Sequence, residues 1–131
     1  MTRLNRGVAL AALLSGLGGM AAAQEMYTIG ISNTVQGNGW REEMVCAMKA
    51  QALDSGMVES LNIAHRNTDA AGQSEDIRNL IQAGVDAIVV NPASPEGIND
   101  AIREATDAGI VVVAVDQAVT EESAYVISNN Q

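Results

Sequence analysis

The sequence predicts an α/β protein with a doubly wound, mostly parallel sheet that carries helices on both faces. Strand-like and helix-like patterns alternate along the chain from residue 27 onward. The apolar runs at 86–90 and 110–115 are continuous rather than alternating, which is typical of strands buried on both faces of a parallel sheet. Because crossovers between parallel strands are right-handed, such an alternation predicts one layer of helices on each face.

Five strands are predicted from short apolar runs that are rich in β-forming residues. They lie at 27–32, 61–65, 86–90, 110–115 and 124–128. Since each helical pattern separates two strand patterns, the first four strands are expected to be mutually parallel.

Three helices are predicted between the strands, at 40–55, 72–83 and 95–108. Each carries apolar residues at helical spacing and ends before a glycine, which favours the left-handed conformation that follows a helix: Gly56, Gly84 and Gly109. Ser94 is the expected N-cap of the third helix, and Pro95 takes the first helical position, where its missing N–H costs nothing.

The first 23 residues have the layout of a secretory signal. Arg3 and Arg6 precede an apolar stretch that is too short to cross a bilayer, and small residues end at Ala23. We expect cleavage after Ala23, export to the periplasm, and one domain at 24–131. The chain stops directly after the predicted fifth strand, which we interpret as the end of a truncated lobe.

Charge and residue types exclude several functions. Without the signal, five basic residues face sixteen acidic ones, a net charge of −11 that disfavours nucleic acids and anionic membranes. Cys46 is alone and cannot form an intrachain disulfide, and His65 is the sole histidine, which we interpret as a packed strand residue. We therefore expect no metal, no cofactor and no enzymatic activity.

Polar residues follow every predicted strand. The carboxyl ends of parallel strands border the crevice in which α/β proteins bind ligands, and amides and carboxylates suit a polyhydroxylated ligand. Each residue alone is equally a common turn former or helix cap. Asp116 stands out because it follows six apolar residues, so we expect a partly dry carboxylate that accepts two hydroxyl hydrogen bonds. The residues concerned are Ser32, Asn33, Asn67, Thr68, Asp69, Asn91, Asp116, Gln117, Ser128, Asn129 and Asn130.

The glycine-containing loop "TVQGNGWREEM" (34–44) raises the question of nucleotide binding. The dinucleotide fingerprint would need a third glycine where Glu42 stands, so this function is disfavoured. Two interpretations of Trp40 stay open. Its indole lies against a sugar ring, with Arg41 bridging hydroxyls, or it packs against Met44 as a hydrophobic staple.

Three stretches carry a resemblance to a known family: "YTIGISNT…GWREEM", "GQSEDIRNLIQAGVDAIVVNPASPEGINDAIREATDAGIVVVAVDQ" and "VISNNQ". Together they resemble the periplasmic sugar-binding proteins of ABC importers, of the ribose, galactose and galactofuranose type, over roughly residues 26–131. The resemblance implies a two-lobed fold that closes around a monosaccharide and then docks on the membrane permease. This chain would supply the amino-terminal lobe, and the full-length protein would be a monomer.

The resemblance also implies a set of ligand-binding residues. They are Asn38, Trp40, Arg41, Asp116 and Asn130. Weaker candidates, taken from the polar residues that follow the predicted strands, are Ser32, Asn91 and Gln117. Gln117 departs from the family pattern, because many members carry a sugar-binding arginine there.

The expected function is that of the substrate-binding subunit of a sugar ABC importer. A secreted domain that senses a sugar or another signal, and a truncated fragment without function, are the alternatives.

Overall fold

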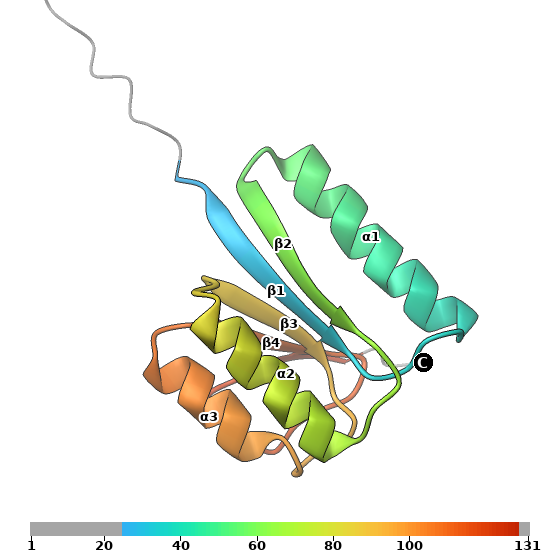
Figure 1. Cartoon of the computed structure of the whole chain (residues 1–131), viewed down its shortest axis with the longest axis vertical. Coiled ribbons are helices and arrows are strands. Elements are labelled where there is room, and N and C mark those ends of the chain that lie inside the picture. Colours follow the sequence, from blue (N-terminus) through green and yellow to red (C-terminus); the bar gives the residue numbers. More distant parts are fainter. Residues whose placement is uncertain (1–24, 129–131) are drawn as a thin grey trace, which may run out of the picture.

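The computed structural model describes residues 25–128 and contains one five-stranded sheet (Figure 1). The strand order is β2-β1-β3-β4-β5, and all neighbouring strands are parallel. The predicted fold class is confirmed. The strands are β1 (Tyr27–Asn33), β2 (Val58–His65), β3 (Ala87–Asn91), β4 (Val111–Val115) and β5 (Tyr125–Ile127).

The helices cover both faces of the sheet. Helix α1 (Gly39–Ser55) lies on one face, and α2 (Ala70–Gln82) and α3 (Asn99–Asp107) lie side by side on the other (Figure 1). The chain moves from β1 to β2 in one direction and from β2 through β3 to β4 in the other. With right-handed crossovers, this reversal places α1 opposite α2 and α3. Among residues 25–128, no helix is long and apolar enough to cross a membrane.

The core lies between the sheet and the α2–α3 layer. Every second residue of β3 and β4 points into this layer, as the alternation of side chains along a strand requires. Burial is complete or nearly so at Ile77, Leu80, Ile88, Val90, Ile98, Ala101, Ile102, Ala105, Val112 and Ala114.

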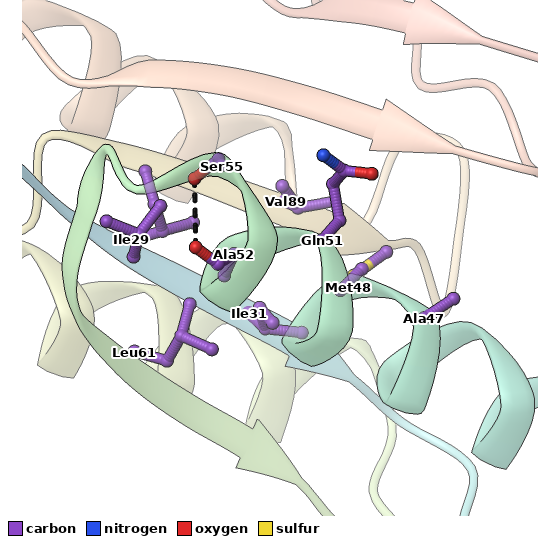
Figure 2. Close-up of a pocket in the computed structure, with 10 residues that line it drawn as sticks. Ile29, Ile31, Ala47, Met48, Gln51, Ala52, Ser55, Leu61 and Val89 are labelled. Atoms are coloured by element: carbon purple, nitrogen blue, oxygen red, sulfur yellow. Dashed lines mark hydrogen bonds between the residues drawn. The ribbon is translucent and has the colours of Figure 1, made fainter.

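The α1 face of the sheet is covered less well than we expected. The continuous apolar runs predicted strands buried on both faces, but Val111 is 47% exposed and Val89 and Val113 are only partly buried. This part of the expectation is wrong for the described residues, because α1 packs against β2 at the edge of the sheet (Figure 1). Between α1 and the sheet runs an apolar groove of about 500 Å³, the α1 groove (Figure 2), lined by residues that include Ile29, Ile31, Met48, Ala52, Leu61 and Val89.

Helix α1 begins one residue earlier than predicted, and the other two helices differ more. Asp69 caps α2 by accepting a hydrogen bond from the Gly72 N–H at 2.9 Å, so this helix begins two residues earlier. Helix α3 begins only at Asn99. Ser94 accepts from the N–H of Gly97 at 3.1 Å, which caps a separate turn ahead of the helix, so its predicted role as N-cap of this helix is wrong.

A buried glutamine ties α2 to the carboxyl ends of two strands. Gln73 is completely buried, and its Nε2 donates to Ser32 Oγ at 3.1 Å and to the Asn91 carbonyl at 3.0 Å. Its Oε1 accepts from the Ala93 N–H at 2.8 Å. Because this one side chain bonds to Ser32 at the end of β1 and to Asn91 and Ala93 at the end of β3, Gln73 holds the two strand ends together.

We expect the Gln73→Ala substitution to lower the free energy of unfolding by about 3 kcal/mol, because it leaves buried polar groups unpaired beside a cavity. Urea denaturation of the full chain measures this change. Gln82→Ala, an exposed glutamine on the same helix, is the matched control and should change stability by less than about 0.5 kcal/mol. Equal effects of the two substitutions would contradict the role of Gln73.

Candidate functional site

A pocket of about 390 Å³, the edge pocket, opens at the carboxyl ends of β4 and β5. Helix α1 contributes one wall and the two strand ends contribute the other. The α1 groove is larger but contains no charged side chain, whereas the edge pocket combines an indole with a carboxylate. It is lined by Trp40, Met44, Met48, Val115, Asp116, Ile127 and Ser128.

Trp40 is the second residue of α1 and forms part of the pocket wall. Its side chain is open to solvent, with 49% of the residue's surface exposed. Met44, one turn further along the helix, lines the same pocket. The indole therefore offers a flat apolar surface beside the pocket, and it shares this pocket with the methionine that the staple interpretation requires.

Asp116 follows β4 directly and has an unusual backbone conformation. Its φ angle is 69°, and among the described residues it is the sole non-glycine residue with a positive φ. Its N–H donates to the Ile127 carbonyl at 2.9 Å, which holds the turn against the end of β5. The side chain is exposed, so the partly dry environment that we expected is absent from this part of the chain. Aspartate tolerates the left-handed region better than most residues, and such strain is concentrated at functional sites.

Asn38 and Arg41 lie at the start of α1, next to Trp40. Asn38 is the N-cap of the helix, and its Oδ1 accepts from the Arg41 N–H at 3.2 Å. The Arg41 guanidinium donates from Nη1 to Asn33 Oδ1 at 2.9 Å. Neither side chain is among those that line the edge pocket, so the structure gives both of them a role in the fold.

The weaker candidates are distributed differently. Ser32 and Asn91 are buried, the former beneath Gln73 and the latter with its Nδ2 3.6 Å from Met44 Sδ. Gln117 is exposed beside Asp116 but does not line the pocket. Asn130 lies outside the described residues.

A hydrogen-bonded cluster that the sequence analysis missed anchors the loop before Trp40. Asn33 is completely buried, and its Nδ2 donates to the Val35 carbonyl and lies 2.8 Å from His65 Nδ1. His65 Nε2 lies 2.9 Å from Glu42 Oε1, which also accepts from the Gly37 N–H at 2.8 Å. The hydrogen bond from the Gly37 backbone, and to a smaller extent the one from His65, lowers the pKa of Glu42.

A signal for this cluster was present in the sequence. Asn33 and His65 are the last residues of neighbouring strands and pair directly in the sheet register. Polar residues that end two adjacent parallel strands are brought together at one edge. We interpreted His65 as a packed strand residue, and its side chain is indeed only 14% exposed.

Comparison with known proteins identifies the family of the chain. Residues 29–131 match the model of the periplasmic binding protein domain. The chain belongs to this family. Its members bind solutes and are not enzymes, which confirms the expectation that the chain has no enzymatic activity.

Individual relatives support the same assignment. A ribose import binding protein of Bacillus subtilis is 30% identical over 95 residues, which are 72% of this chain and 30% of the relative. A galactofuranose-binding protein of Escherichia coli is 29% identical over 84% of this chain and 34% of its own length. The chain thus spans about a third of the length of these curated relatives.

A solved structure agrees with the sequence relatives. An ABC transporter solute-binding protein of Thermobispora bispora is 34% identical and has a TM-score of 0.70, over 79% of this chain and 34% of that protein. The likeness therefore concerns the sheet and helices described above.

The left-handed backbone at Asp116 yields a stability prediction. Asp116→Val should lower the free energy of unfolding by about 1–2 kcal/mol, because a β-branched residue clashes with its own backbone at positive φ, whereas Asp116→Gly should be neutral or stabilising. Urea denaturation of the full chain distinguishes the two variants. Gln117→Val, at the neighbouring exposed position, is the control, and an equal loss in this variant would exclude backbone strain as the cause.

Proposed function

We propose that this protein is the substrate-binding subunit of a sugar ABC importer, which captures a monosaccharide in the periplasm and delivers it to the permease. The observation that carries the proposal is the edge pocket, in which an exposed indole and a carboxylate from distant parts of the chain meet. Sugars present an apolar C–H face, which an indole can cover, and a rim of hydroxyls, which can donate to a carboxylate.

In this proposal the residues divide the ligand between them. The Trp40 indole stacks on the ring, and Asp116 accepts hydrogen bonds from two hydroxyls. Arg41 and the amides of Asn38 and Asn130 contact the remaining hydroxyls. Gln117 follows Asp116 in the sequence, and its side-chain amide would be an additional hydrogen-bond donor to the ligand.

The charge of the edge pocket favours a neutral sugar. Its lining residues include one ionisable group, the carboxylate of Asp116. An acidic sugar or a sugar phosphate would place a second negative charge beside this carboxylate, which is unfavourable. The ribose- and galactofuranose-binding relatives support the same class of ligand.

The remaining parts of the proposal concern the whole protein. Residues 1–23 act as a signal peptide that is cleaved after Ala23, and residues 24–131 form the amino-terminal lobe of the binding domain. A second lobe closes over the edge pocket, and the closed monomer docks on the permease.

Replacement of the carboxylate tests the site. In the full-length protein, Asp116→Ala should weaken the binding of a neutral monosaccharide more than about 100-fold, because two charge-assisted hydrogen bonds are lost. Isothermal titration calorimetry with a panel of neutral and acidic sugars measures this. Asp107→Ala, an exposed aspartate at the end of α3, should leave the affinity unchanged. Full affinity of Asp116→Ala would refute the assignment of the site.

The indole offers a second test, because the chain contains a single tryptophan. Binding of a sugar should change the fluorescence of Trp40, and Trp40→Ala should weaken binding about 10-fold or more through the loss of one stacking surface. Trp40→Phe retains a smaller ring and should lose less. If sugar binds without a fluorescence change and Trp40→Ala binds normally, the residue serves as a hydrophobic staple.

A further inference from the structure

We propose that Asn33 and His65 position Arg41 at the ligand-binding edge, and that they do so while His65 is neutral and carries its proton on Nε2. The consequence for sugar affinity rests on the proposed function. The positioning itself follows from the chemistry of the side chains that meet at the ends of β1 and β2.

Two fixed partners determine how the Asn33 amide is oriented. A guanidinium can only donate, so the atom 2.9 Å from Arg41 Nη1 must be the amide oxygen. The Val35 carbonyl can only accept, so the atom 2.8 Å from it must be the amide nitrogen. Because Asn33 is completely buried, water cannot replace either partner at low cost.

The orientation of Asn33 in turn determines the protonation of His65. The same amide nitrogen lies 2.8 Å from His65 Nδ1. Only an unprotonated ring nitrogen can accept a hydrogen bond from an N–H group, so Nδ1 carries no proton. The other ring nitrogen, Nε2, lies 2.9 Å from the Glu42 carboxylate and donates to it. The ring is therefore the neutral Nε2–H tautomer.

Protonation of the His65 ring would disrupt its contact with Asn33 but not its contact with Glu42. A proton on Nδ1 would point at the Asn33 NH₂ group. A rotation of the amide would satisfy His65 but would turn the NH₂ group toward the Arg41 guanidinium and the amide oxygen toward the Val35 carbonyl. No orientation of Asn33 satisfies all three partners at once, so a charged His65 weakens the hold of Asn33 on Arg41.

The other groups around the ring limit the change to Arg41. Glu42 faces Nε2 from α1 and attracts an imidazolium, so its hydrogen bonds to His65 and to Gly37 persist. Arg66, the next residue, forms an ion pair with Asp76 of α2 at 2.9 Å and so has its own partner. The Gln36 side chain donates to the His65 carbonyl, which does not titrate. The glycine loop therefore stays anchored while the hold on the guanidinium is loosened.

A looser hold on Arg41 should weaken sugar binding. A held guanidinium is already ordered, whereas a free one loses rotamer freedom when the ligand binds. We expect the affinity to fall about three- to tenfold when His65 gains a proton on acidification.

Nitrogen-15 NMR of the full-length protein tests the positioning without any ligand. At pH 8, Nδ1 of His65 should resonate as an unprotonated nitrogen and Nε2 as a protonated one. On acidification, the side-chain signals of Asn33 and Arg41 should shift together with those of His65, while the Gly37 amide stays constant. A proton on Nδ1 at pH 8, or an Arg41 signal that ignores the titration, would overturn the proposal.

Two variants link the cluster to sugar affinity. His65→Asn places an amide oxygen near the position of Nδ1 and cannot gain a proton, so its affinity should be closer to wild type than that of His65→Phe and should not vary between pH 5 and 8. His65→Phe keeps an aromatic ring without an acceptor and should bind more weakly at every pH. An identical pH profile in wild type and His65→Asn would refute the positioning role even though the sugar binds. If no sugar binds, the proposed function fails, and the NMR experiment still decides the positioning.

Discussion

The reversal of strand order at β1 is the constraint on which the rest of the structure depends. Because β1 lies between β2 and β3 and all strands are parallel, the carboxyl ends of three strands meet around one residue. Asn33 is that residue, and it pairs in register with His65 on one side and Asn91 on the other. The same reversal sends α1 to the face opposite α2 and α3. The anchor of the loop before Trp40, the start of α1 and the edge pocket all depend on this reversal of strand order.

The two faces of the sheet differ in how completely they are packed, and the edge pocket lies at the less packed one. The α2–α3 layer buries its side of β3 and β4 fully, whereas α1 buries only Val45 among its own residues. As a result, apolar side chains remain exposed on the described part of this face, among them Val111, Tyr125 and Ile127. Such surfaces mark places where a protein meets something else. The proposed ligand-binding edge therefore lies next to the part of the fold that has the least packing of its own.

The sequence predicted the fold well because the signals for it are local. Buried apolar runs and helix-ending glycines fix element type and order without reference to other parts of the chain. Predicting the site was harder. Trp40 and Asp116 share a pocket because both stand at the carboxyl edge, as the strand-end rule requires. Ser32 and Asn91 obey the same rule but are covered by Gln73 and Met44, and burial of this kind depends on packing that no local pattern encodes. The same holds for the late start of α3, which depends on the turn that Ser94 caps.

Structural and ligand-binding roles of the loop residues are compatible because each role uses different atoms. Asn38 caps α1 through its oxygen, which does not engage the two N–H donors of the same amide. Arg41 bonds Asn33 through Nη1, and a guanidinium has five N–H donors in all. The contacts that hold the loop therefore do not exhaust the contacts that it can make. They order the donors before a ligand arrives, and the entropy that binding would otherwise lose is lost during folding instead. For this reason His65 and Glu42, which do not line the edge pocket, belong to the proposed binding edge as much as the pocket lining does.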